Sequence, residues 1–256
     1  MGTITNDLSQ KSAYSKDLET AMFFSGMRVE LSPLTSILEW IPHPAIQHFL
    51  NSTKRLHSYG LAAIEKSKSA TAKSSNRGTI FSKMLNESEA GSGGLSDSEI
   101  EREASNLIVA GSDTTAVTLT YLVYSVLTHP AIKERVLSEV STLTPMFSSK
   151  EANALPYLSL VIKETLRLYG AAPGSLPRTV PEGGRNLGGH FLPEGTTVST
   201  QAFTLHRDAT IFEDPEAFKP ERWESPTQNM KDAFMPFGGG SRSKSCHYSQ
   251  QFRSQF

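Results

Sequence analysis

Two stretches of the chain hold side chains that could carry out chemistry. The first, AGSDTT at residues 110–115, places the carboxylic acid of Asp113 beside the hydroxyl of Thr114. An acid and an alcohol at adjacent positions could relay protons to a reacting group. The second, FGGGSRSKSCH at residues 237–247, holds Cys246, the only cysteine in the chain, beyond three glycines. A thiolate on such a loop could bind iron, with backbone amides facing the sulfur.

A third stretch could be structural rather than reactive. In KETLR at residues 163–167, Glu164 and Arg167 lie three residues apart and so share a helix face. An exposed pair of this kind contributes little to stability, but the neighbouring residues are mostly leucine and valine, which predicts burial. A buried pair needs further partners, and Arg222 in FKPERW is available. We therefore predict a structural cluster of Glu164, Arg167 and Arg222.

The candidate proton relay lies in a predicted long helix. Ser96 followed by Glu99 is a capping-box signature for the helix start. His129-Pro130 predicts the helix end near Leu127. At 1.5 Å per residue the helix is about 45 Å long.

Residues 110–115 disfavour a regular helix ladder, because glycine and short hydroxyl side chains compete with it. We expect a local distortion there; the alternative is a threonine-rich packing seam with Gly111 allowing close approach. The apolar run 106–127 is also long enough to span a membrane. Asp113 within the run argues against a span, so we expect a helix buried in protein.

The remaining elements follow from prolines and turns. Helices are predicted to begin at Pro130 and at Pro156. Residues 185–203 predict two short strands around the turn Pro193-Glu194-Gly195. Residues 206–237 are too rich in proline for regular elements and too apolar for disorder, so side-chain contacts must hold them. Residues 66–94, rich in serine, lysine and glycine, predict a flexible loop.

Composition sets limits on the class of protein. The chain has 256 residues, of which 38% are hydrophobic and 20% charged, which is typical of a globular protein. A net charge of −1 gives no indication of a nucleic-acid partner, and one cysteine cannot form an internal disulfide. The apolar residues of 22–50 indicate core or partner contact, or alternatively contact with a membrane surface or an apolar ligand. A phosphate-binding role for GGGSR is excluded, because Walker spacing is lacking.

Taken in order, these stretches resemble the cytochrome P-450 haem-thiolate monooxygenases over about residues 15–243. AGSDTT resembles the oxygen-activation motif of the family and KETLR its Glu-x-x-Arg motif. FKPERW resembles the segment that supplies an arginine to that motif, and PFGGGSR the start of the haem-binding loop. The surrounding sequence is most similar to filamentous-fungal members that modify secondary metabolites.

The resemblance implies a mainly α fold with a small β region, built on a long central helix, the Glu-x-x-Arg helix and the haem-binding loop. It implies that Asp113 and Thr114 deliver protons during oxygen activation, and that Glu164, Arg167 and Arg222 are structural. The haem-binding residues that it implies are Ala110, Gly111, Arg178, Phe237, Gly238 and Arg242. Of these, the two arginines match residues that pair with the propionates. Cys246 is the candidate iron ligand.

The cysteine of the loop departs from the family pattern. The pattern F-G-x-G-x-R-x-C-x-G calls for cysteine where this chain has Lys244, and Cys246 follows two residues later. Two residues add up to about 7 Å of extended chain, whereas a metal–ligand distance tolerates about 0.2 Å. His247 is a second candidate ligand. We therefore expect 1–16 to be a disordered segment, 17–243 the C-terminal portion of a P-450 domain, and 244–256 a tail unlike the family.

Two functions follow. The first is a haem-dependent monooxygenase that inserts one oxygen atom into an apolar small molecule in fungal secondary metabolism, with electrons from an NADPH-dependent reductase. The second is a non-catalytic fragment or pseudoenzyme that does not bind haem. Intact members of the family are expected at the endoplasmic reticulum membrane surface, with contact through 22–50. This chain, without a recognisable anchor helix, is expected in the cytoplasm.

Overall fold

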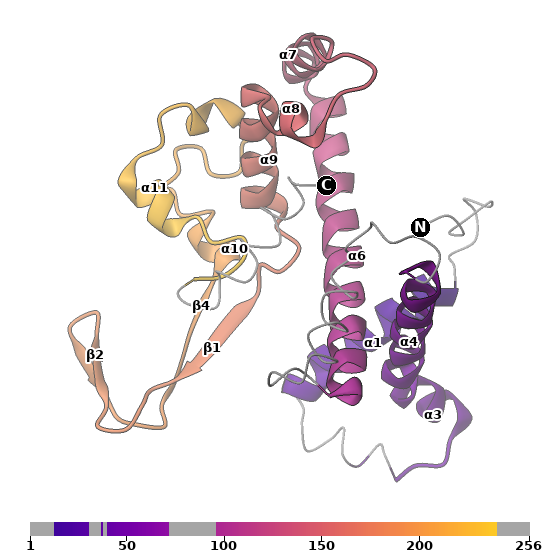
Figure 1. Ribbon diagram of the computed structural model, residues 1–256. Helices are drawn as coiled ribbons and strands as arrows, with labels where there is room; N and C mark the ends of the chain where they lie inside the picture. Colours follow the sequence, from indigo (N-terminus) through magenta and orange to yellow (C-terminus); the bar gives the residue numbers. More distant parts are fainter. Residues whose placement is uncertain (1–12, 31–36, 38–39, 72–95, 240–256) are drawn as a thin grey trace. The chain divides into compact units, whose positions relative to one another are not determined.

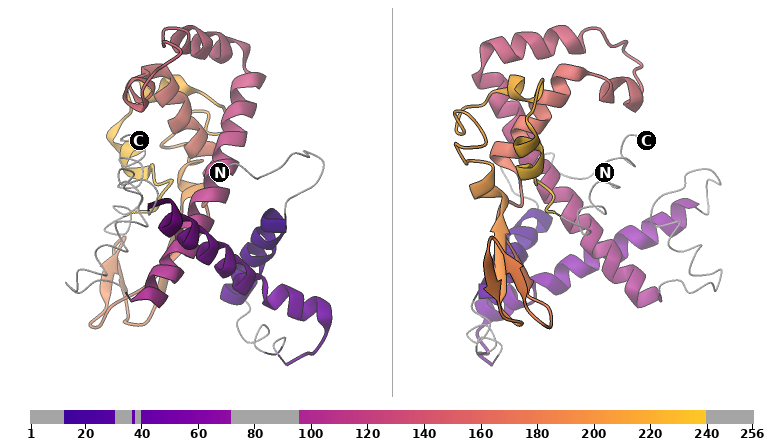
Figure 2. Two further views of the ribbon diagram at one scale, coloured as in Figure 1. Left: turned by 45° about the vertical axis from the view of Figure 1, so that its right-hand side comes forward. Right: turned by 90° about the vertical axis from the view of Figure 1, so that its left-hand side faces the viewer.

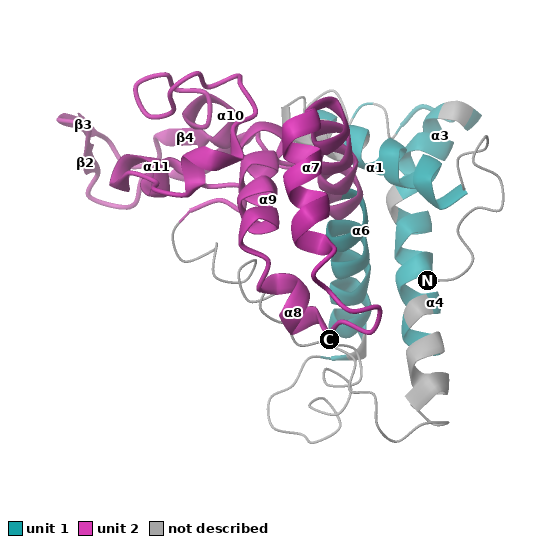
Figure 3. Cartoon of the chain, turned by 90° about the horizontal axis from the view of Figure 1, so that it is seen from above, with its two compact units in different colours: residues 1–113 teal, residues 114–256 magenta. Residues whose placement is uncertain are grey.

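The computed structural model describes residues 13–30, 37, 40–71 and 96–239 of the chain. It divides into two compact units, Met1–Asp113 and Thr114–Phe256, which are coloured separately in Figure 3. The described part is largely helical with a few short strands (Figure 1), which confirms the predicted fold class.

The first unit is a small helical assembly. It contains α1 (Ala13–Glu30), α3 (Pro44–Leu50), α4 (Ser52–Thr71) and the first part of α6 (Asp97–Thr128). Its core consists of apolar side chains from α1, α4 and α6: Leu18, Ala21, Leu56, Ile64, Ile100 and Ala104. Helix α4 approaches α6 closely at Gly60, where an added Cβ would lie 2.1 Å from Ser105 Oγ. A glycine is therefore required at this contact.

Two expectations for this part of the chain change. Helix α1 begins at Ala13, inside the segment 1–16 that was expected to be disordered. Helix α4 continues to Thr71, so residues 66–71 are helical rather than part of the predicted loop, and residues 72–95 lie outside the described residues. The prediction relied on a high serine and lysine content, but lysine is a good helix former.

The long helix α6 begins and ends where the sequence predicts. The Glu99 carboxylate accepts hydrogen bonds from Ser96 N at 2.8 Å and from Ser96 Oγ at 2.6 Å, which satisfies an N-terminal amide. The helix ends at Thr128, directly before His129 and Pro130. The expected distortion at 110–115 is not found, because α6 is continuous. Threonine hydroxyls farther along bond to carbonyls four residues back without breaking the ladder, as Thr118 Oγ1 does to Thr114 O at 2.9 Å.

The apolar surface of α6 is more exposed than predicted. Leu122 and Val126 pack against the core of the second unit. Large side chains on its other faces remain exposed: Leu119, Val123, Tyr124 and Leu127. Within the described residues, α6 is also the one helix long and apolar enough to span a membrane, and none of that window is buried. The expectation of a helix buried in protein is therefore wrong for this window, since these large side chains of α6 are exposed.

The second unit continues with α7 (Pro130–Val140), α8 (Ser149–Asn153) and α9 (Pro156–Tyr169). Helices α7 and α9 begin at the predicted prolines. Their shared core joins Ile132 and Val136 of α7 to Tyr157, Val161 and Leu168 of α9. Helix α8 was not predicted, although its capping box, Ser148 with Glu151, is visible in the sequence.

The β region consists of two short antiparallel ladders. Strand β1 (Ser175–Thr179) pairs with β4 (Thr197–Gln201), and between them β2 (Arg185–Leu187) pairs with β3 (His190–Leu192). The β2–β3 hairpin is thus the tip of an arm whose base is the β1–β4 ladder (Figures 1 and 2). The strands predicted around 193–195 exist, but they pair with β2 and β1 rather than with each other.

The segment 206–237 is mostly irregular, as predicted, with three short elements at or near it. These are α10 (Ala202–Leu205), the 3-10 helix η1 (Pro220–Trp223) and α11 (Gln228–Ala233). Thr227 caps α11 by accepting a hydrogen bond from Met230 N. A second core, formed by Phe212, Trp223, Met230 and Ala233, holds this segment together.

Candidate functional site

The centre of the second unit is a carboxylate that is completely buried. Glu164, on α9, is 0% exposed. Its Oε1 accepts hydrogen bonds from Arg167 Nη2 at 2.8 Å, Lys219 N at 2.9 Å and Arg222 Nε at 3.0 Å. Its Oε2 accepts from Arg167 Nε and from Trp223 Nε1, both at 2.9 Å. Each carboxylate oxygen thus accepts at least two hydrogen bonds, which offsets the desolvation of its charge.

The two arginines of this cluster extend its contacts into the irregular segment. Arg167 Nη1 donates to the carbonyl oxygens of His206 at 2.6 Å and Pro215 at 2.7 Å. Arg222 Nη1 donates to Glu213 O at 2.8 Å. Buried carbonyls without a helix or sheet partner destabilise a fold unless another donor reaches them. Arg167 supplies donors to such carbonyls, and Arg222 bonds a further carbonyl nearer the surface. These contacts explain how a proline-rich segment holds one conformation.

The sequence predicted Glu164, Arg167 and Arg222 as a cluster but missed Trp223 and His206. Trp223 follows Arg222 directly, and an indole N–H that is buried needs an acceptor. His206 Nδ1 lies 2.9 Å from Arg167 O, and His206 Nε2 lies 2.9 Å from Met235 N. Both partners of His206 are backbone groups, so no side-chain pattern could have indicated them.

The glycine stretch begins with a turn over residues 235–238. Gly238 N donates to Met235 O at 3.1 Å, with Pro236 and Phe237 at the centre of the turn. Gly238 has φ 78°, in the left-handed region that favours glycine. A Cβ at Gly238 would lie 3.4 Å from Leu176 Cδ1 of β1. The turn and β1 are therefore neighbours.

Arg178 lies on that same strand and is exposed. Its Nη1 donates to Pro177 O at 2.7 Å. Among the residues that the structure describes, no carboxylate pairs with this guanidinium. Leu176 offers an apolar side chain, and Arg178 on the same strand offers a guanidinium without an acidic partner among the described residues. Such a pair suits a flat apolar group that carries carboxylates, as a haem does along its propionate edge.

The residues predicted to face the haem and to relay protons all lie on α6. Gly111, Asp113 and Thr114 are half-buried, and Ala110 is exposed. The division between the two units falls directly after Asp113. Arg242, Lys244, Cys246 and His247 lie outside the described residues. Within the described part, no three His, Cys, Asp or Glu side chains gather as metal ligands would.

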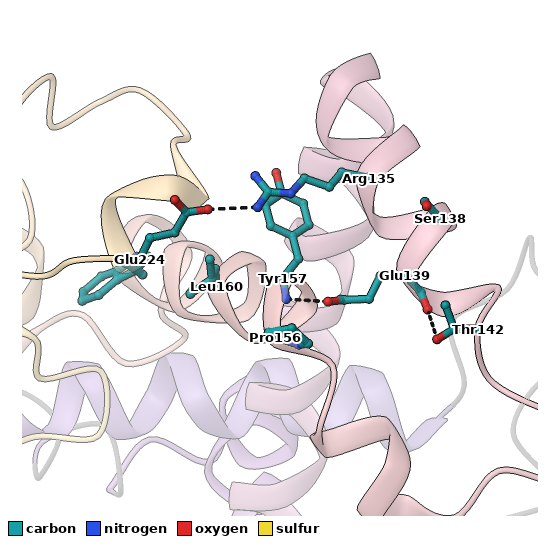
Figure 4. Close-up of a pocket in the computed structure, with 9 residues that line it drawn as sticks. Arg135, Ser138, Glu139, Thr142, Pro156, Tyr157, Leu160 and Glu224 are labelled. Atoms are coloured by element: carbon teal, nitrogen blue, oxygen red, sulfur yellow. Dashed lines mark hydrogen bonds and ion pairs between the residues drawn. The ribbon is translucent and has the colours of Figure 1, made fainter.

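A surface pocket of about 540 Å³ lies elsewhere in this unit, between α7, the start of α9 and η1 (Figure 4). Its polar groups are paired with one another. Arg135 contacts Glu224 at 2.9 Å, and Tyr157 Oη donates to Glu221 at 2.8 Å. Burial, followed by that hydrogen bond to Glu221, raises the pKa of Tyr157 to about 12. The Glu139 carboxylate accepts from Tyr157 N at 2.7 Å and from Leu158 N at 2.8 Å, and so caps α9. The pocket is a structural junction rather than a place for chemistry.

Comparisons with known proteins agree with the family that these motifs resemble. Residues 4–245 match the family model described as Cytochrome P450. The chain is 43% identical over 235 residues to cytochrome P450 monooxygenase tazI of Aspergillus terreus, an alignment that covers 91% of this chain and 48% of that protein. It is 51% identical over 164 residues to cytochrome P450 monooxygenase orf2 of Aspergillus niger, covering 64% of this chain and 33% of that protein.

A third relative, cytochrome P450 monooxygenase stcB of Emericella nidulans, is 39% identical over 202 residues, covering 78% of this chain and 38% of the relative. The chain therefore spans at most about half the length of these relatives. All three come from filamentous fungi, which agrees with the resemblance inferred from the motifs. The chain belongs to the cytochrome P450 family.

Proposed function

We propose that this chain carries the haem-binding part of a fungal monooxygenase that inserts one oxygen atom into an apolar small molecule of secondary metabolism. The observation that carries the proposal is the family match over residues 4–245. When bound, a haem with a cysteine ligand supplies the oxygen-activating chemistry of such enzymes. Electrons would come from an NADPH-dependent reductase.

The candidate site residues outside α6 have these roles in the proposal. Leu176 and the turn at Phe237–Gly238 would contact the porphyrin edge, and Arg178 would pair with a propionate. Arg242 would be a second propionate partner, and Cys246 the iron ligand.

On α6, Ala110 and Gly111 would face the haem. Asp113 would hold a proton on its carboxyl group and pass it through the Thr114 hydroxyl. Glu164, Arg167 and Arg222 would keep the segment before the loop in place without touching the substrate.

A specific observation favours a second function, that of a non-catalytic fragment. Lys244 occupies the position at which the family pattern has cysteine. An ammonium directed at an apolar macrocycle would be strongly disfavoured by desolvation. Haem uptake by the chain as it stands is therefore the point on which the two functions differ.

The experiment is expression with haem supply, followed by reduction and addition of carbon monoxide. A thiolate-ligated haem gives a strongly red-shifted Soret band. Cys246 is the only cysteine of the chain, so Cys246→Ser must abolish that band if the monooxygenase proposal is right. A matched double variant, Lys244→Cys with Cys246→Ser, restores the family spacing.

The outcomes separate the two functions. A band in the wild type that is lost in Cys246→Ser supports the enzyme. A band that appears only in the double variant supports the fragment, and it shows that the proposed haem-binding residues can still hold haem once the cysteine spacing is restored. If no variant takes up haem, the proposed set of haem-binding residues is refuted.

We also propose that an enzyme of this kind works at the endoplasmic reticulum membrane surface. Exposed apolar side chains gather in the segment suggested for membrane contact, namely Met22, Phe23, Ile37, Trp40 and Ile41. Flotation with lipid vesicles tests this contact, and replacement of Phe23 and Trp40 by serine should weaken it.

A further inference from the structure

His206 is a buried histidine to which the proposed function gives no role. Only 2% of its surface is exposed. It follows α10 directly, and its ring stacks on Phe234 with centroids 5.5 Å apart. The edge of Phe212 closes another side at 6.4 Å. The ring is thus held in a fixed orientation by aromatic side chains.

The partners of the ring determine its tautomer. Arg167 O can only accept, so Nδ1 must carry the proton and donate to it over 2.9 Å. Met235 N can only donate, so Nε2 must be unprotonated and accept over 2.9 Å. The neutral Nδ1–H form satisfies both backbone groups at once. Neither the other tautomer nor the protonated ring can do so.

These two hydrogen bonds join segments that are far apart in the sequence. Arg167 lies near the end of α9 and belongs to the Glu164 cluster. Met235 opens the turn that leads to Phe237 and Gly238. We propose that His206 is a positioning residue that fixes this turn to the end of α9 through its Nε2 acceptor, and so sets where the glycine loop begins. The importance of the turn for haem rests on the proposed function; the fixing itself does not.

The charges near the ring favour its neutral form. Burial is the main reason that the pKa of His206 falls to about 4; hydrogen bonds to the backbone of Arg167 and Ala233 oppose this fall, and the cationic side chains of Arg167 and Arg207 add to it. Arg207 Nη2 donates to Leu168 O at 2.8 Å, beside the carbonyl that His206 uses. The nearby carboxylate of Glu164 accepts two hydrogen bonds from the guanidinium of Arg167. The Nε2 acceptor is therefore retained at neutral pH.

A pair of substitutions separates the two hydrogen bonds. The amide of His206→Asn reaches the Nδ1 position and keeps a donor for Arg167 O, but it leaves Met235 N without a partner. The longer amide of His206→Gln reaches the Nε2 position and keeps an acceptor for Met235 N. Exchange of the Met235 amide hydrogen is measured against that of Val161, in the core of α9. His190→Asn, on an exposed strand, is the control.

In His206→Asn we expect Met235 exchange to accelerate about tenfold or more relative to Val161, because a buried amide loses its acceptor. In His206→Gln it should stay within about threefold of wild type. Equal acceleration in both variants, or none in either, overturns the proposal.

The wild-type protein provides a test that does not depend on the folding of any variant. Nitrogen NMR of the ring should show the Nδ1–H tautomer, with a scalar coupling across the hydrogen bond from Met235 N to His206 Nε2. A ring protonated on Nε2 overturns the proposal. If the wild type binds no haem, the proposed function fails while these measurements still decide the role of His206. If it does bind haem, His206→Asn should release haem faster than His206→Gln does.

Discussion

Replacement of Glu164 by glutamine is the sharpest test of the buried cluster. The substitution keeps the size of the side chain, so no cavity adds to the effect. It removes the negative charge between Arg167 and Arg222, and it turns one acceptor oxygen into an NH₂ group that faces other donors. Oε2 accepts from Arg167 Nε and Trp223 Nε1, so at least two buried N–H groups lose their acceptor if the NH₂ takes that position.

Breaking a buried charge pair on one side typically costs about 3–5 kcal/mol. A domain of this size has a total free energy of unfolding of about 5–15 kcal/mol. With a urea dependence of about 2 kcal/mol per molar, the midpoint should fall by about 2 M. The indole of Trp223 is hydrogen-bonded to Glu164 and packs 4.7 Å from Phe234, so its fluorescence reports directly on the cluster.

The assay is urea unfolding in a Trp40→Phe background, because Trp40 is 87% exposed and would dilute the signal. Glu224→Gln is the matched control. Glu224 pairs with Arg135 at 2.9 Å, but both side chains are about half exposed, at 49% and 51%. The control should lose less than about 1 kcal/mol. If Glu164→Gln loses no more than the control, the cluster does not hold the segment together and the reasoning is refuted.

Three further predictions follow from particular contacts. The pKa of His206 is about 4 in the folded protein, against an ordinary value of 6.5. Between these pH values the unfolded state binds more protons than the folded state does. The free energy of unfolding should therefore fall as the pH drops from about 6.5 to about 4. Urea unfolding at several pH values measures this, and His206→Gln should flatten the dependence. Gly60→Ala gains about 1 kcal/mol of helix propensity, but its Cβ would lie 2.9 Å from Ser105 Cα. Thermal unfolding followed by circular dichroism should therefore show a net loss of stability. The control Gly174→Ala, which has open space around it, should show no such loss. Glu139→Ala removes the cap of α9 and should cost about 1–2 kcal/mol; its neighbour Ser138→Ala is the control, and an equal effect of both would contradict the capping role.

Signals that depend on one short stretch of sequence predicted the helices well. Ser96 with Glu99 marks the start of α6, and His129-Pro130 its end, because capping and proline geometry are local properties. The starts of α7 and α9 at prolines follow for the same reason. The Glu164 cluster could be anticipated because an ion pair on an apolar helix face requires a partner from elsewhere.

Contacts to backbone groups could not be predicted in this way. Glu139 caps a helix that begins sixteen residues after its own helix ends. The acceptors of Arg167 in the irregular segment are carbonyls, and every residue type has one. The exposure of α6 was missed because composition alone does not say how many faces of a helix meet a core.

The Glu164 cluster and His206 together explain why the spacing of the glycine loop matters. Glu164 holds Arg167 and Arg222, Arg167 holds the carbonyl of His206, and the ring of His206 holds Met235 N. If His206 fixes the turn as proposed, Phe237 has a fixed position, and the number of residues between Phe237 and an iron ligand determines where that ligand can lie. Two additional residues before Cys246 then cannot be absorbed by a shift of the turn, because that would leave Met235 N buried without an acceptor. The variant with Lys244→Cys and Cys246→Ser should therefore bind haem more tightly than the wild type, and equal binding by the two would show that the loop adjusts beyond Gly238.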